Sequence, residues 1–347
     1  MKTPQFQAVP DTGRLAGALT DLAEQTSVEG PWRSGAFAAL ARSGLLAAFI
    51  PTDEGGTAAA EPDIMAALVA IAERCLTTAL ALTQWAAAVR IIAGGPAHVK
   101  HELLPPLARG DTLTTVGISQ LTTSRRHLGR PALAATRDGD AWRLDGICPW
   151  VTGGDSTQTI VTGAATDDGG QMFFVVPTDA PGLAIDPPLE MLGLTGSRTS
   201  AVHFAAVKPM HVLPPATTGG PRTGGLSTTA LAVGAARASG RVLQREAATR
   251  PALAGIAGEF ANEIATVESK LLAAANMGIE PADRDRLRAD ANSLVVRAAQ
   301  AALTATKGAG FIRGHPVERL VRESLFFLVW SCPQAVTDAF LCDLTAG

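Results

Sequence analysis

The spacing of apolar residues changes twice along the chain, and this order limits the folds that it can adopt. Residues from about 10 to 110 have helical spacing, as in the Ala- and Leu-rich segment 64–70. Between about 113 and 213, short β-branched runs such as 172–176 alternate with Asp/Gly turns such as 167–170. From about 226 onward the helical spacing returns. We therefore predict a helical domain at 1–112, an antiparallel β domain at 113–215 and a helical bundle at 216–347.

Composition and charge exclude several classes of function. The net charge of -3 gives no electrostatic basis for binding nucleic acid or an anionic membrane. The 4 cysteines and 6 histidines have no metal-ligand spacing, so we expect no metal site. We also expect no membrane span, because no apolar run approaches the ~18 residues that one needs. The polar start of the chain does not resemble a signal peptide, and together these features favour a cytoplasmic location.

Five segments contain Gly, Pro and aromatic residues in a distinctive order. Two lie in the N-terminal helical zone, with Ile-Pro-Thr-Asp-Glu-Gly-Gly at 50–56 and Leu-Pro-Pro-Leu-Ala-Arg-Gly at 104–110. Two more lie in the β zone, at 140–154 and at 192–209. The first of these ends in Pro-Trp-Val-Thr-Gly-Gly. The fifth is Gly-Phe-Ile-Arg-Gly-His-Pro-Val-Glu-Arg at 310–319. In order and spacing, these segments resemble landmarks of the acyl-CoA dehydrogenase family.

The resemblance implies an α+β fold with an N-terminal helical domain, a middle antiparallel β-barrel-like domain and a C-terminal four-helix bundle. It also implies a homodimer or homotetramer that holds FAD between the domains and across a subunit contact. The implied activity is that of an oxidoreductase of fatty acid metabolism, which oxidises an acyl thioester at its alpha-beta bond. Such an enzyme needs an electron-transfer or reductase partner.

The flavin ring has two predicted contact segments. Trp150 and Thr152 are two residues apart on a predicted strand, so their side chains share one face. By resemblance, the indole covers the isoalloxazine ring and the hydroxyl binds the flavin edge. Ile118 and Ser119 occupy the place of family residues that meet the flavin pyrimidine.

The phosphate and adenine portions of FAD have weaker matches. The family arginine that meets the pyrophosphate maps onto Arg250, without the Phe-Gly pair that normally follows it. The adenine-side glycine motif retains Gly308 and Gly310 but has Lys307 at its first position. The arginine that many members direct at CoA maps onto Gly225, which places CoA binding in question.

The catalytic residue of this chain is unknown, because neither of the family's usual base positions contains a carboxylate. Spacing places these positions at Ser331 and Gly224, and no Asp or Glu lies between Glu190 and Glu246. Three functions therefore stay open. The first is FAD-dependent oxidation with an atypical or absent base. The second is monooxygenation by reduced flavin, with FMN as an alternative cofactor, and the third is a non-catalytic binding or assembly subunit.

Overall fold

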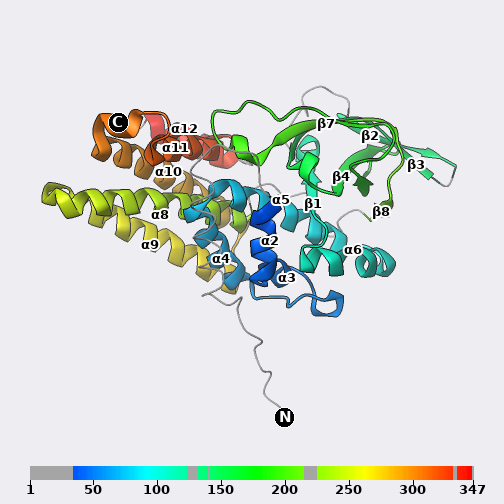
Figure 1. The fold of residues 1–347 in the computed structure, drawn as a ribbon, viewed down its shortest axis with the longest axis horizontal. Coiled ribbons are helices and arrows are strands. Elements are labelled where there is room, and N and C mark those ends of the chain that lie inside the picture. The colour runs from blue at the N-terminus through cyan, green and yellow to red at the C-terminus, as the bar shows by residue number, and fades with distance from the viewer. Residues whose placement is uncertain (1–33, 123–130, 140, 215–224, 331–333, 346–347) are drawn as a thin grey trace, which may run out of the picture.

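The N-terminal helices lie between a β-sheet and a bundle of long C-terminal helices (Figure 1). The computed structural model describes residues 34–122, 131–139, 141–214, 225–330 and 334–345. Helix, sheet and helix follow one another along the chain, as the apolar spacing predicts. The N-terminal elements are α2 (Ser34–Arg42), α3 (Leu45–Ala48), the 3-10 turn η1 (Thr52–Glu54), α4 (Glu61–Arg74), α5 (Leu76–Ala93) and α6 (Ala97–Arg109).

Helix α5 is long and apolar enough, by length and composition, to cross a membrane. Its 18 residues have a mean hydropathy of 1.4, so the expectation that no run approached this length was wrong. Polar residues such as Gln84 and Arg90 interrupt the apolar run without lowering its mean hydropathy enough. However, 67% of the helix is buried inside the fold, as in a core helix.

The middle zone forms one sheet in the strand order β6-β7-β3-β2-β4-β5-β8, with β1 paired to β4. Most neighbouring strands are antiparallel, as expected, but β1 and β2 each pair with β4 in parallel. Alternating apolar residues predict a strand but not its partner, which is why the sequence did not indicate the mixed sheet. The strands are β1 (Thr114–Gly117), β2 (Leu133–Asp138), β3 (Ala141–Thr152), β4 (Thr159–Thr166), β5 (Gln171–Pro177), β6 (Leu183–Ile185), β7 (Thr199–Val207) and β8 (His211–Leu213).

Three long helices and two shorter ones make up the described part of the C-terminal zone. They are α8 (Leu226–Thr249), α9 (Ala254–Met277), α10 (Pro281–Thr306), α11 (Pro316–Leu325) and α12 (Gln334–Thr345). Two short 3-10 segments, η6 (Lys307–Phe311) and η7 (Phe326–Leu328), follow α10 and α11. The predicted four-helix bundle thus includes an additional terminal helix.

Helix α8 crosses α4 closely because Gly234 has no side chain. A Cβ atom there would lie 2.5 Å from the carbonyl oxygen of Val69 and 2.6 Å from the Ala72 Cβ. The crossing joins the N-terminal and C-terminal helices into one hydrophobic core, while the sheet has a second core of its own. The crossing positions α8 against α4, and the first turn of α8 lines the site described next.

Candidate functional site

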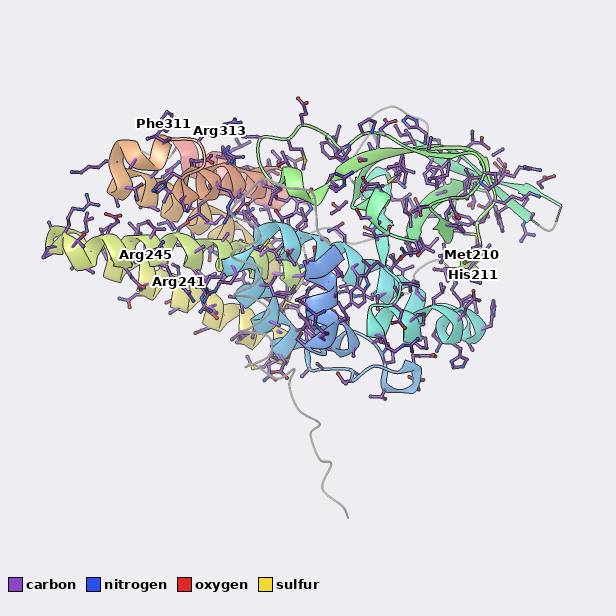
Figure 2. All side chains as sticks on the ribbon, in the orientation of Figure 1. Met210, His211, Arg241, Arg245, Phe311 and Arg313 are labelled. Atoms are coloured by element: carbon purple, nitrogen blue, oxygen red, sulfur yellow. The ribbon has the colours of Figure 1, made fainter. Side chains whose placement is uncertain are left out.

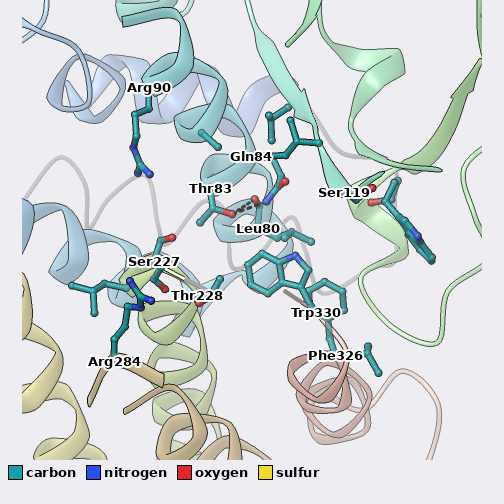
Figure 3. A pocket seen from close by; sticks show the side chains of 18 of the residues that line it. Leu80, Thr83, Gln84, Arg90, Ser119, Ser227, Thr228, Arg284, Phe326 and Trp330 are labelled. Atoms are coloured by element: carbon teal, nitrogen blue, oxygen red, sulfur yellow. Dashed lines mark hydrogen bonds between the residues drawn. The ribbon is translucent and has the colours of Figure 1, made fainter. Parts of the chain in front are cut away.

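A cavity of 710 Å³ lies where the helical zones meet the sheet. This volume is typical of sites for small molecules and cofactors. Its walls come from α5, the end of β1, β3, the first turn of α8, the α9–α10 connection and the segment after α11. Segments far apart in the sequence therefore converge on one space (Figure 3).

One wall contains three of the predicted flavin residues. Ile118 and Ser119 follow β1, and Trp150 lies near the end of β3; all three line the cavity. Trp150 is 49% exposed, which is unusual for an indole that has a sheet behind it. Val151 is buried in the sheet's own core, so the preceding residue, Trp150, points toward the opposite face. An exposed, flat aromatic surface beside backbone and hydroxyl groups fits the edge and face of an isoalloxazine ring.

Thr152 lies behind this wall rather than on it. Its side chain is buried, and its Oγ1 is 3.1 Å from Oγ1 of Thr199, which does line the cavity. The backbone oxygen of Thr152 accepts a hydrogen bond from Thr115 Oγ1 at 2.8 Å. Thr152 is thus adjacent to the predicted flavin site, and its direct contact with flavin stays a prediction.

Gln120 supports the same wall, a role that the sequence analysis missed. Its Nε2 donates to the backbone oxygens of Gly117 at 3.1 Å and Gly163 at 2.8 Å, while its Oε1 accepts from Cys148 Sγ at 3.0 Å. Burial raises the pKa of the Cys148 thiol to about 12, although hydrogen bonds with the Trp150 backbone and Ser119 lower it in part. The thiol is therefore a protonated structural donor and not a nucleophile.

The opposite wall is aromatic and follows α11. Trp330 stacks on Phe326 with 5.1 Å between ring centroids, and both line the cavity with Val329. Beneath them lies Arg288, whose side chain is fully buried and whose Nη2 donates to the Trp330 backbone oxygen at 3.3 Å. The Arg288 guanidinium is 5.7 Å from the Trp330 ring centroid, which is within cation–π range. No motif in the sequence identified this wall.

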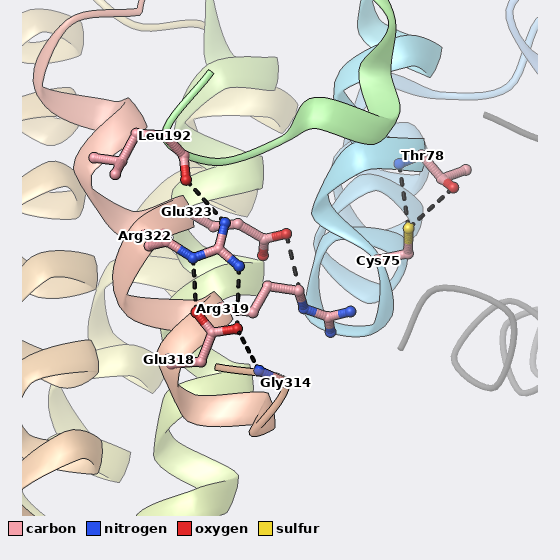
Figure 4. A network of polar contacts seen from close by, with 8 residues as sticks. All are labelled: Cys75, Thr78, Leu192, Gly314, Glu318, Arg319, Arg322 and Glu323. Carbon is pink, nitrogen blue, oxygen red and sulfur yellow. Dashed lines mark hydrogen bonds and ion pairs between the residues drawn. The ribbon is translucent and has the colours of Figure 1, made fainter. Parts of the chain in front are cut away.

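An ion pair on α11 links two of the five motif segments (Figure 4). Arg322 Nε donates to Glu318 Oε2 at 2.7 Å, and its Nη1 donates to the backbone oxygen of Leu192 at 2.8 Å. The hydrogen bond from Arg322 holds the pKa of Glu318 below its ordinary value. Because Met191 lines the cavity next to Leu192, this contact aligns the aromatic wall with the sheet.

The residues predicted for the phosphate and adenine portions lie at the other end of the bundle. Arg250 follows the last residue of α8, whereas the first turn of that helix lines the cavity. The 24 residues of α8 span about 36 Å at about 1.5 Å each. Gly308 and Gly310 lie just beyond the far end of α10, beside the labelled Phe311 and Arg313 (Figure 2). Within one chain, a single FAD therefore does not reach both predicted sets.

Some of the residues predicted for the phosphate and adenine portions already have contacts within the chain. Arg250 Nη2 donates to Glu246 Oε2 at 2.5 Å and also to the Ala305 backbone oxygen. A Cβ on Gly310 would lie 2.0 Å from Thr306 Oγ1, so this glycine permits close packing. A Cβ on Gly308 would meet nothing within 4 Å. The three residues are near one another, and their contact with a cofactor stays a prediction.

The expected base positions lie outside the described residues, both for Ser331 and for Gly224. Gly225, the predicted counterpart of the CoA-directed arginine, lines the cavity. Among the described lining residues the one carboxylate is Glu61, an exposed residue at the start of α4. Within the same described ranges, no group of His, Cys, Asp and Glu has the arrangement of a metal site.

Comparisons with known proteins agree with the five-segment resemblance. A sequence profile described as "Acyl-CoA dehydrogenase, N-terminal domain" matches residues 15–111. The chain is 26% identical over 340 residues to the probable acyl-CoA dehydrogenase YngJ of Bacillus subtilis (strain 168), a match that covers 87% of each chain. The chain is therefore similar to acyl-CoA dehydrogenases over most of its length.

Solved structures share the fold over nearly the whole chain. Butyryl-CoA dehydrogenase from Megasphaera elsdenii superposes with a TM-score of 0.81 at 18% identity, covering 99% of this chain and 100% of that chain. A KijD3 structure in complex with FMN and a dTDP-linked amino keto sugar superposes with a TM-score of 0.79 at 22% identity, covering 99% and 95%. At this coarse level, the comparisons support a flavin-dependent oxidoreductase.

Proposed function

We propose that this protein is an FAD-dependent oxidoreductase that oxidises a small organic substrate, an acyl thioester or a related compound, in the cavity. One observation supports this most strongly. The exposed Trp150 indole lies on the cavity wall next to Ile118 and Ser119, on the segments that resemble flavin-binding segments of the family. A substrate in the remaining volume would lie between that wall and the aromatic wall of Phe326 and Trp330.

For one FAD to contact both sets of predicted residues, a second copy of the chain is needed. Arg250, Gly308 and Gly310 lie about 36 Å from the cavity, at the far ends of α8 and α10. In a symmetric dimer, the far end of one copy would approach the cavity of the other, and a self-complementary contact of this kind would form two equivalent sites. A homodimer, or a homotetramer built from such dimers, is therefore part of the proposal.

A bound flavin supplies the two-electron chemistry, and the side chains position the substrate and move its proton. Phe326 and Trp330 would exclude water from the reacting atoms. Abstraction of a proton alpha to a carbonyl needs a base within reach. Glu61 is the carboxylate that we propose for this role, since it is the one acid among the described lining residues.

A second candidate is oxygenation by reduced flavin, with FMN as the alternative cofactor and a separate reductase as partner. The observation in its favour is the scarcity of acids on the wall. Apart from Glu61, the described lining residues have no carboxylate, and neither Ser331 nor Gly224 could act as one. Oxygenation requires no alpha-proton base, so this cavity would suffice for it.

The decisive experiment is a titration of the purified protein with FAD and FMN, followed by visible absorption. We expect a bound, perturbed flavin band, which anaerobic addition of the substrate acyl thioester bleaches. Bleaching only by a reductase, followed by oxygen-dependent product formation, would favour the second candidate. No binding of either flavin would refute both and leave a non-catalytic binding or assembly subunit.

A further inference from the structure

Two arginines line the cavity from opposite sides. Arg90 lies on the last turn of α5, and Arg284 lies on the first turn of α10. Figure 3 shows both guanidinium groups directed toward Ser227, at the start of α8. In the same view, Ser119 lies at the other side of the cavity, with the Trp330 ring between. The cavity thus has a cationic end that is separate from its predicted flavin wall.

Neither arginine is fully paired. Arg90 forms no ion pair or hydrogen bond with any residue that the structure describes. Arg284 Nε lies 3.7 Å from Asp285 Oδ1, beyond hydrogen-bond distance. That nitrogen is buried and has no hydrogen-bond partner. A buried donor without an acceptor is costly, so an acceptor from a ligand would be favourable here.

Most of the charged groups on the lining are cationic. Helix α8 begins here, and its N-cap Gly225 makes no side-chain cap hydrogen bond. The helix dipole therefore adds partial positive charge to that of the arginines. Glu61 also lines the cavity, but it forms no ion pair with either arginine. The described lining thus has two arginines and one carboxylate, Glu61; Asp285, which lies beside Arg284, is not part of the lining.

We propose that the cationic end, defined by Arg90, Arg284 and Ser227, binds an anionic group of the substrate, a carboxylate or a phosphate ester. The inference rests on the proposed function in that it names the class of substrate for the same cavity. Guanidinium forks match the geometry of both anions. The anion anchors one end of the substrate, and the rest extends past Trp330 toward Ser119 and Trp150. A purely apolar acyl chain would leave the arginine donors unpaired.

Binding to the full-length protein without added flavin tests the proposal separately from the redox function. The probes are two N-acetylcysteamine thioesters of equal length, one ending in a carboxylate (glutaryl) and one in a methyl group (pentanoyl). Pentyl phosphate and pentanol form a second pair. Calorimetric titration gives the affinities at low and high salt for the native protein and for Arg90→Gln, Arg284→Gln and the control Arg245→Gln. Arg245 is an exposed residue on α8 and is labelled in Figure 2.

We expect the anionic member of at least one pair to bind about tenfold more tightly than its neutral partner. The preference should shrink at high salt, since Arg90 is exposed and its charge is screened. It should be lost in Arg90→Gln and Arg284→Gln and kept in Arg245→Gln. A preference for the glutaryl thioester identifies a carboxylate substrate, and one for pentyl phosphate identifies a phosphate ester.

Equal affinities within both pairs would overturn the inference, as would a preference that both cavity variants keep. We expect the Arg90→Gln variant to fold normally, because this exposed side chain has no described partner to lose. If anions bind and no flavin does, the proposed redox function fails while the anion site stands. If flavin binds and the anion preference is absent, the anion site fails while the proposed redox function stands.

Discussion

Cys148 donates a hydrogen bond from its thiol to Gln120 Oε1 over 3.0 Å, directly behind the wall that contains Ser119 and Trp150. Gln120 in turn holds the backbone of Gly117 and Gly163, so one buried amide joins β1, β3 and β4. The position of the predicted flavin wall therefore depends on a buried polar network as well as on apolar packing.

The Cys148 thiol should make stability fall at high pH. Its pKa is about 12 in the folded protein, above its ordinary value of 9.0, so the unfolded chain loses this proton first as pH rises. The free energy of unfolding is unaffected below pH 9 and decreases above it, by at most about 1.4 kcal/mol per pH unit up to about pH 12. Urea denaturation of the native protein and Cys148→Ala, compared between pH 8 and 11, isolates this effect. The chain has no tyrosine to titrate in that range. A constant difference between the two proteins would contradict the prediction.

Trp150→Ala should weaken flavin binding without unfolding the protein. The indole is 49% exposed, so its removal leaves little empty core, whereas a stacked ring would lose its contact. We expect the dissociation constant for FAD to rise about tenfold, with a small change in melting temperature. Trp142→Ala is the matched control, because Trp142 packs on Phe174 at 5.8 Å on the other side of the sheet. That variant should lose stability but keep its flavin affinity, and the opposite pattern would remove Trp150 from the site.

Arg322→Gln should loosen the contact between the aromatic wall and the sheet. The change removes hydrogen bonds to Glu318 and to the Leu192 backbone, so we expect a loss of about 1–3 kcal/mol near pH 7. The pKa of Glu318 is lowered in the folded state, so its stabilising effect is present above the ordinary glutamate value of 4.5 and disappears as pH falls through the lowered pKa. Denaturation at pH 7 and pH 3 should therefore show a smaller difference at pH 3. Arg297→Gln, in an exposed pair with Glu263, should cost about 1 kcal/mol or less.

The local motifs predicted much of the fold and one wall of the site. Trp150, Ile118 and Ser119 lie on segments whose residue types are distinctive by themselves, and the structure brings them together. The structure also places Arg250 near Gly308, because each residue follows the end of a long helix and the two helices are adjacent. No motif indicated that these helices separate the two sets of predicted residues by about 36 Å.

The remaining site residues have no sequence signal because they depend on tertiary packing. Arg90 and Arg284 lie in helices as ordinary charged positions, and only the crossing of α5, α8 and α10 directs them into one cavity. In the sequence, Trp330 is one residue of an apolar run. Its place on the aromatic wall follows from its stacking on Phe326. Gln120 is an ordinary polar position in the sequence, and its hydrogen bond to β4 forms only in the folded sheet.

Gly234→Ala should destabilise the α4–α8 crossing. The new Cβ would lie 2.5 Å from a backbone oxygen and 2.9 Å from a backbone nitrogen, neither of which is free to move. We expect a loss of about 1–3 kcal/mol in the free energy of unfolding. Gly258→Ala on α9 is the control, since a Cβ there meets nothing within 4 Å. It should stabilise the helix by up to about 1 kcal/mol, and equal effects at both positions would show that the crossing tolerates a methyl group.

Glu61→Gln separates the two candidate functions. If Glu61 accepts the alpha proton, the rate of flavin reduction by the acyl thioester should fall at least about 100-fold, because general bases typically contribute that much. Flavin affinity should not change, since Glu61 belongs to α4 and not to the wall of Trp150 and Ser119. Stopped-flow absorption under anaerobic conditions measures the rate, with Glu259→Gln on the exposed face of α9 as the control. An undiminished rate would exclude Glu61 as the base. Substrate-dependent oxygen consumption that needs a reductase and survives the substitution would instead identify oxygenation as the reaction of this cavity.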